Sequence, residues 1–193
     1  MLTVLCAPAA LALALACGGG SSASVDGPNL PPSGPMVPIP ANLWQPPAGS
    51  TPLKGSYTYL EMDAGFSPGV SYPLTIVTPP GAFSVSATEG RLSVVAVDAA
   101  AGYAMNSVFQ TMIGLTRLEE GYYADVRAPA QSDPLRGAMS VALNSRSCDS
   151  LAGWFAIDHV FYFNGFLTTL DMRFEARCTG FAAPMRGQIH WRE

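Results

Sequence analysis

The sequence predicts an all-β fold for residues 53–193. From about residue 53 onward, short apolar runs are separated by Gly, Pro, Asn and Asp, which is typical of strands joined by turns. Residues 169–178 alternate strictly between apolar and polar side chains, as a strand with one buried face does. No segment sustains the 3.6-residue spacing of a helix, because the best candidate, 98–105, is interrupted by Gly102.

The turn residues divide this region into ten expected strands. We expect them at 56–61, 71–78, 82–87, 91–97, 103–112, 121–127, 138–143, 153–162, 166–177 and 185–191.

The last two long strands form the clearest predicted hairpin. Asn164 and Gly165 accept the positive φ values of a tight two-residue turn. Along 169–178 the apolar set is expected to face the core. The polar set, which includes Arg173 and Glu175, is expected to face water.

The strand before this turn changes its alternation part-way. The apolar residues Phe155 and Ile157 stand at odd-numbered positions, whereas Val160 and Tyr162 stand at even-numbered ones. A β-bulge at residue 158 or 159 produces such a change, since it inserts one extra residue. With that bulge, Phe161 and Phe163 would point outward, near Trp154.

The first sixteen residues predict an export signal. Residues 1–16 are uncharged and rich in Leu, Ala and Val, and they are too short for a membrane-spanning helix. Residues 14–18 are similar to a bacterial lipobox, in which Cys17 becomes the acylated first residue of the mature chain, carrying palmitate or a similar acyl group. Gly18 favours sorting to the outer membrane in a cell with two membranes. The alternatives are an ordinary signal cleaved after Ala16, with secretion and an incidental Cys17, and a buried N-terminal element.

Residues 17–52 are expected to form a disordered linker rich in Gly, Ser and Pro. Nine of the seventeen prolines lie between residues 28 and 52, and proline favours extended polyproline II. The apolar residues Val37, Ile39, Leu43 and Trp44 allow two other interpretations. The segment could lie along the domain and cover an apolar face, or it could be a proline-rich ligand for a partner.

Two cysteines remain once Cys6 and Cys17 are assigned to the signal and the anchor. In an exported protein the pair Cys148 and Cys178 is expected to form a disulfide, with free thiols as the alternative. A metal site is not expected, because the chain has only two histidines, His159 and His190, and no C-x-x-C motif.

Composition narrows the classes of partner. The net charge of −4 and the absence of a basic run argue against nucleic acid or anionic lipid surfaces. The apolar content of 49% argues against disorder throughout the chain. We expect no cofactor.

No catalytic pattern stands out. Residues 65–69 match G-x-S-x-G, but Pro68 follows the serine and a strand comes next, so a turn is expected at Ser67. Glu119 and Glu120 precede Gly121 and also indicate a turn. Residues 61–63 present two carboxylates that could help hold calcium, although a loop edge is the simpler interpretation. We therefore expect no enzyme activity.

Three segments together resemble a family of exported bacterial β-sandwich domains of unknown function. These are 146–160, with its Cys, Gly and Phe spacing, 174–180 and 185–189. Segments 122–129, 83–87 and 91–94 extend the resemblance over about 56–192. It implies a single antiparallel β-sandwich, a Cys148–Cys178 bridge and export, often as a lipoprotein, and it carries no catalytic site. Arg177 stands where the family has His, and Trp154, Phe161 and Phe163 stand at usually polar positions.

These three aromatic residues form the candidate binding surface. Aromatic rings on a sheet face can contact a protein partner or stack on sugars, unless the proline-rich segment covers them. We therefore expect a membrane-anchored envelope protein with a non-catalytic structural or protein-binding domain. A carbohydrate-binding module that uses this aromatic face is the alternative.

Overall fold

A computed structural model describes residues 37–79, 81–148 and 150–193. The predicted export signal at 1–16 and the predicted lipidation site Cys17 lie outside the described residues. The all-β prediction is confirmed, because the described part of the chain has eleven strands, one short 3-10 turn at Pro129–Gln131 and no α-helix. Nowhere in that part is there a helix that could cross a membrane.

All ten expected strands are present, with shifts at some ends. An additional two-residue strand, β8, was not expected. The strands are β1 (Tyr57–Glu61), β2 (Leu74–Val77), β3 (Ala82–Thr88), β4 (Arg91–Asp98), β5 (Tyr103–Gln110), β6 (Gly121–Arg127), β7 (Ala138–Leu143), β8 (Arg146–Ser147), β9 (Leu151–Phe163), β10 (Phe166–Cys178) and β11 (Met185–Arg192).

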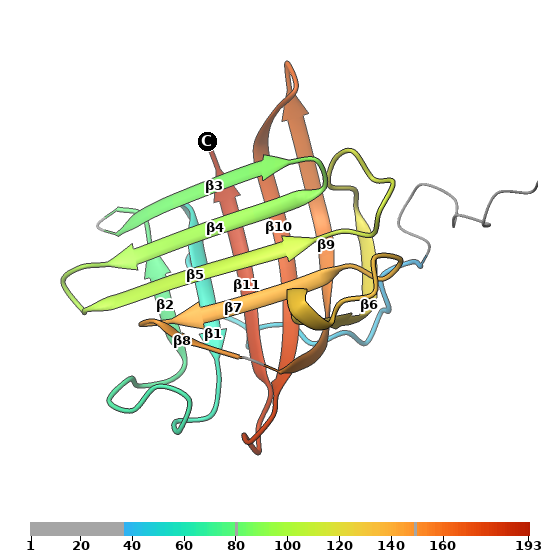
Figure 1. Cartoon of the computed structure of the whole chain (residues 1–193). Helices are drawn as coiled ribbons and strands as arrows, with labels where there is room; N and C mark the ends of the chain where they lie inside the picture. Colours follow the sequence, from blue (N-terminus) through green and yellow to red (C-terminus); the bar gives the residue numbers. More distant parts are fainter. Residues whose placement is uncertain (1–36, 80, 149) are drawn as a thin grey trace, which may run out of the picture. The chain divides into compact units, whose positions relative to one another are not determined.

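Hydrogen bonds connect the strands into one nearly closed sheet in the order β2-β1-β11-β10-β9-β6-β7-β5-β4-β3, with β8 on β7. Every pairing is antiparallel except that of β6 with β7, which joins at one residue pair, Arg127 and Ala138. The half that contains β9, β10 and β11 faces the half that contains β3, β4, β5 and β7, and the strands of the two halves cross steeply (Figure 1).

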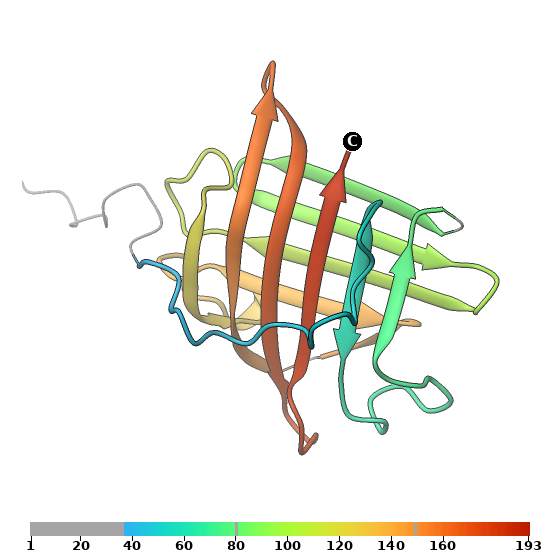
Figure 2. The ribbon, with the colours of Figure 1, turned by 180° about the vertical axis from the view of Figure 1, so that it is seen from behind.

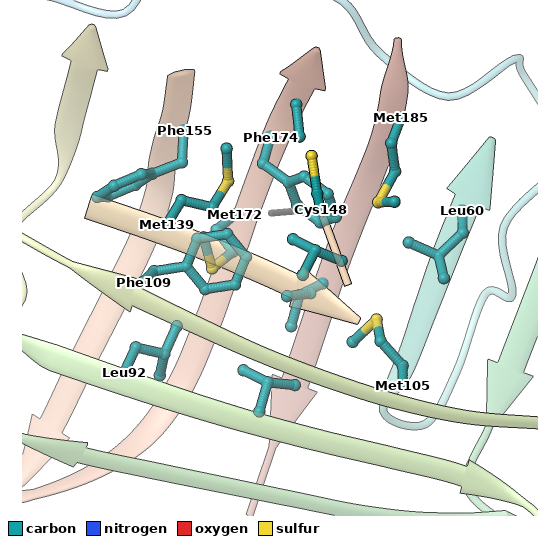
Figure 3. Close-up of a cluster of buried hydrophobic side chains, with 14 of the residues drawn as sticks. Leu60, Leu92, Met105, Phe109, Met139, Cys148, Phe155, Met172, Phe174 and Met185 are labelled. Atoms are coloured by element: carbon teal, nitrogen blue, oxygen red, sulfur yellow. The ribbon is translucent and has the colours of Figure 1, made fainter. Parts of the chain in front are cut away.

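The hydrophobic core fills the space between these halves (Figure 3). Phe109 of β5 contacts two rings of the opposite half, with centroid distances of 5.6 Å to Phe155 and 5.3 Å to Phe174. Leu60 of β1 and Met172 of β10 are also fully buried. The large apolar area removed from water is the main source of stability for this fold.

The β9–β10 hairpin confirms both local predictions. The apolar set of β10 lies in the core, and Asn164 and Gly165 have φ values of 50° and 83°, as the predicted turn requires. Asp171 pairs with His159, whereas the next residue, Met172, pairs with Ile157. Asp158 is therefore the extra residue of a β-bulge.

The outward face of β10 differs from the prediction. Arg173 and Glu175 were expected to face water, but each is only 7% exposed. Each carboxylate or guanidinium on this face has an ionic partner, and the chain before β1 passes over the strands. The alternation identified the two faces correctly, but it could not show that a second segment covers the polar one.

That covering segment is residues 37–53, which we call the arm. It crosses the outer side of β6, β9, β10 and β11 before it enters β1 (Figure 2). The carbonyl of Val37 accepts a hydrogen bond from the Tyr122 amide at 3.2 Å. Trp44 stacks on Tyr59 with ring centroids 6.3 Å apart. A disordered linker is therefore not what residues 37–52 form. They lie along the domain, as the alternative interpretation has it, although the face beneath them is largely polar.

The predicted disulfide between Cys148 and Cys178 is confirmed. It links the end of β10 to the segment between β8 and β9 and closes a loop across a sequence separation of 30 residues. Because this loop contains the whole β9–β10 hairpin, the bond ties the base of the hairpin to the core.

Candidate functional site

The three aromatic residues of the candidate surface do not lie together. Trp154 is partly buried, pairs across the ladder with Glu175 and contacts the ring of Tyr122 at 5.9 Å. Phe161 lies seven residues further along β9, which corresponds to about 20 Å of strand. Phe161 and Phe163 therefore belong to a different part of the surface from Trp154.

The two phenylalanines join a third one at the end of the hairpin. Phe161 is 53% exposed, Phe163 is 62% exposed, and Phe166, which pairs with Phe163 across the turn, is 73% exposed. This end of β9 and β10 extends past the neighbouring strands (Figure 1). We call these three residues the hairpin tip. The sequence prediction missed Phe166, although its position directly after the Asn-Gly turn was a usable signal.

The hairpin tip is held firmly at its base. The Tyr162 hydroxyl accepts a hydrogen bond from the Leu118 amide at 3.1 Å, and burial raises the pKa of this phenol. The Arg117 guanidinium lies 6.0 Å from the same ring, within the range of a cation–π contact. Residues 160–170 contain no charged side chain. The tip is thus an apolar projection on a fixed support.

A second site lies where the arm crosses the sheet. A groove of about 450 Å³ separates arm residues 45–51 from the outer face of β9, β10 and β11. Its sheet side is polar and consists of Asp158, His159, Asp171, Arg173 and Gln188.

The polar residues at and beside the groove form two cross-strand rows, which the strand register brings together. The first row, read from β9 to β1, is His159, Asp171, His190 and Tyr57. The second row, read from β10 to β1, is Arg173, Gln188 and Tyr59. Side chains directly opposite in adjacent strands lie within contact distance, so each row is continuous across its strands.

The second row is fixed by the buried Arg173. Its guanidinium donates to both carboxylate oxygens of Asp158 at 2.8 and 2.6 Å. It also donates to the carbonyl oxygens of Leu43 and Trp44 at 3.4 and 2.7 Å. The bulge that places Asp158 next to Arg173 therefore also fixes the path of the arm.

The first row is fixed by pairs between histidine and carboxylate. Asp171 accepts from Nδ1 of His190 and, at 2.7 Å, from the Arg192 guanidinium. His159 pairs through Nδ1 with Glu120 at 2.8 Å, and the His190 ring stacks on Tyr57 at 5.1 Å. These contacts hold the imidazoles in defined orientations.

The arm forms the other wall of the groove through a tight turn. The carbonyl of Pro47 accepts from the Ser50 amide at 3.0 Å and from the Ser50 hydroxyl at 2.7 Å. Pro46 and Pro47 line the groove from this side. Proline restricts the backbone, so this wall is stiff.

Sequence reasoning did not identify this groove. It placed Arg173 and Glu175 on a water-exposed face and considered His159 and His190 as possible metal ligands. A possible signal was that β10 and β11 both carry polar residues at alternate positions. When two such strands pair, these residues come together on one face of the sheet. The apolar residues of the arm indicated a segment lying along the domain, but they gave no sign that it crosses this polar face.

The remaining candidate residues serve local structure. Ser67 is 5% exposed and sits in a turn between β1 and β2, where Arg146 donates to the carbonyl of Phe66 at 2.9 Å. Glu61 accepts from the Tyr59 hydroxyl at 2.9 Å, and Asp63 accepts from the Gly65 amide at 2.8 Å. Over the ranges that the structure describes, no three His, Cys, Asp or Glu residues are placed to hold a metal ion.

Compared with family models, curated proteins and solved structures, the chain matches none of them.

Proposed function

We propose that this chain is a cell-envelope lipoprotein that presents a non-catalytic binding domain. Export and acylation at Cys17 would hold the chain on a membrane, which is the outer membrane where the cell has two. The domain would bind a protein partner through the hairpin tip. The single observation that carries the binding role is the exposure of Phe161, Phe163 and Phe166 at the end of an uncharged projecting hairpin.

A protein partner suits this tip for a physical reason. Aromatic side chains contribute much of the energy of protein interfaces when they fill a pocket on the partner. The β ladder, the disulfide at its base and the Tyr162 contacts hold the hairpin in place before binding. Little conformational entropy is then lost when the rings are bound.

We also infer that the domain is a β-sandwich. The two facing halves are joined by the single β6–β7 residue pair, Arg127 and Ala138, and the core lies between them. The resemblance to exported β-sandwich domains supports the same assignment.

Mass spectrometry of the mature protein tests the anchor. Cells that express the chain are grown with an alkyne analogue of palmitate, and the label is expected on wild type and absent from Cys17→Ser. Cys148→Ser is the matched control and should retain the label. An unmodified mature N-terminus at residue 17 or later would contradict the lipoprotein proposal.

Site-specific photo-crosslinking tests the hairpin tip. A photo-reactive phenylalanine analogue replaces Phe163, and the same analogue at Ile113, a 61% exposed position in another loop, is the control. We expect one crosslinked protein from position 163, lost when Phe166→Ser is added. If positions 163 and 113 yield the same products, the tip is not a specific binding surface.

A carbohydrate-binding role is the second candidate. The flat aromatic face that it was expected to use is not formed, because Trp154 lies far from Phe161 and Phe163 along the strand. The observation that favours this role is the polar groove under the arm.

A further inference from the structure

We propose that the groove between the arm and β9–β11 binds a neutral sugar of one or two rings. This inference names the site and ligand class of the second candidate function and does not depend on the hairpin tip. The sheet side would hydrogen-bond the sugar hydroxyls. The rings of Pro46 and Pro47 would contact the C–H groups of the sugar.

The groove has the dimensions of a small-ligand site. Its volume of about 450 Å³ lies within the range of roughly 300–1,000 Å³ for ligand pockets. A binding site of this kind combines apolar contact area with a few fixed polar groups that set orientation. Here the arm supplies the apolar wall, and the outer face of the sheet supplies the polar groups.

The polar groups match hydroxyls, which both donate and accept hydrogen bonds. Asp158 and Asp171 offer acceptor oxygens, and the Gln188 amide, whose oxygen accepts from Tyr57, offers N–H donors. Arg173 has one N–H left after its four hydrogen bonds. His159 uses Nδ1 for Glu120, so Nε2 is its nitrogen for a ligand. The sheet side of the groove therefore offers both donors and acceptors, which the hydroxyls of a sugar ring require.

The charges of the groove favour a ligand without charge. Asp158 is paired with the Arg173 guanidinium, and Asp171 with the Arg192 guanidinium. An anionic ligand would lie against two carboxylates, and a cationic ligand would compete with guanidinium groups that are already paired. A neutral polyol avoids both costs.

The groove is organised before any ligand arrives. Arg173 makes four hydrogen bonds, two to Asp158 and two to arm carbonyls. The Ser50–Pro47 turn holds the opposite wall. Side chains fixed by such supporting contacts lose little freedom on binding, which favours affinity for a small ligand.

Binding is tested with the full chain, purified in a detergent that has no sugar headgroup. The probes are maltose, cellobiose and di-N-acetylchitobiose, with glucuronic acid and glucosamine as charged counterparts. Saturation-transfer NMR reports binding, and ¹H–¹⁵N shifts locate it. We expect at least one neutral probe to bind with a dissociation constant on the order of 1 mM, with shifts at residues 45–51, 158–159, 171–173 and 188.

A matched pair of variants tests the residues. Gln188→Leu is expected to weaken binding roughly tenfold, the effect of losing about one hydrogen bond to the ligand. Gln110→Leu makes the same chemical change on β5 and should bind like wild type. The shift map of the wild-type chain remains decisive even if Gln188→Leu fails to fold.

Three results would overturn the inference. One is that none of the neutral probes binds at about 10 mM, roughly tenfold above the expected dissociation constant. Another is a shift map centred away from the groove. The third is tighter binding of glucuronic acid or glucosamine than of any neutral probe. None of these results bears on the crosslinking experiment, so failure of the sugar site and failure of the hairpin-tip contact are distinguishable.

Discussion

Arg173 and Asp158 form a two-point ion pair, with nitrogen–oxygen distances of 2.8 and 2.6 Å, on the outer face of the sheet. Asp158 is the extra residue of the β9 bulge, and Arg173 also donates to the Trp44 carbonyl at 2.7 Å. One buried guanidinium therefore connects an irregularity in β9, the central strand β10 and the arm. Loss of this side chain should affect all three.

We predict that Arg173→Met lowers the free energy of unfolding by about 2–4 kcal/mol, because it leaves the partly buried Asp158 without its counter-charge. The arm should also loosen, since two of its carbonyl contacts come from Arg173. Urea unfolding measures the first effect. Chymotrypsin cleavage after Trp44 measures the second.

Arg127→Met, at an exposed position on β6, is the matched control and should change neither measurement appreciably. Arg173→Lys should be intermediate, because lysine keeps the charge but cannot pair with both carboxylate oxygens. Equal stability and equal cleavage for Arg173→Met and Arg127→Met would contradict the role of Arg173.

Removal of the disulfide should destabilise the domain substantially. The bond closes a loop across 30 residues, for which the loop-entropy relation gives about 3–4 kcal/mol. The double variant Cys148→Ser with Cys178→Ser is therefore expected to unfold at a lower urea concentration than wild type. If a reducing agent leaves the unfolding midpoint of wild type unchanged, the bond contributes nothing under those conditions.

Stability should fall in strongly alkaline solution because of buried tyrosines. Burial raises the pKa of the Tyr123 phenol above its ordinary value of 10.0, and the phenol donates to the Glu119 carbonyl at 2.9 Å. As pH rises, the unfolded chain ionises this group before the folded protein does. The stabilisation that depends on the protonated phenol is therefore complete below pH 10 and is lost above it. In that range the free energy of unfolding falls by about 1.4 kcal/mol per pH unit for one such group.

Urea unfolding at several pH values above 9 measures whether the free energy of unfolding falls as pH rises. Tyr123→Phe should be less stable at neutral pH by about 1 kcal/mol, for the lost hydrogen bond, and should show a shallower alkaline slope. Parallel slopes for the two proteins would mean that Tyr123 ionises equally in both states.

Gly153→Ala is expected to disturb the start of the β9–β10 ladder. A Cβ atom at Gly153 would collide with the backbone oxygen of Glu175, and backbone atoms cannot rotate away as a side chain can. The two strands would have to separate locally, at a cost of roughly 2–3 kcal/mol. Thermal unfolding measures the loss, and an unchanged midpoint would show that the ladder adjusts freely.

Local chemistry explains why the strands of this fold could be predicted. The order and approximate ends of ten strands followed from turn residues, since Gly, Pro and Asn end a strand wherever they occur. The alternation in 169–178 identified the core side of β10, and the parity change around Asp158 located the bulge. These are properties of short segments, and they do not depend on the rest of the chain.

Contacts between distant segments explain what could not be predicted. The residues up to 52 were expected either to form a free linker or to lie along the domain, and the sequence named no strand that they would contact, because polyproline-like segments have no internal hydrogen bonds that report a partner. The arm's contacts with Tyr122 and Arg173 come from residues that follow it by more than eighty positions. Trp154 and Phe161 seemed close because both point outward from one strand, yet the strand length separates them.

The sequence by itself determined the all-β class, the strands, the hairpin turn, the bulge and the pairing of Cys148 with Cys178. Only the tertiary structure decided that Arg173 and Glu175 are buried, that Phe166 joins the exposed tip and that a polar groove lies under the arm. The reason is physical. Strands are set by the local preferences of the backbone, whereas a site is set by which strands become neighbours and by what covers them.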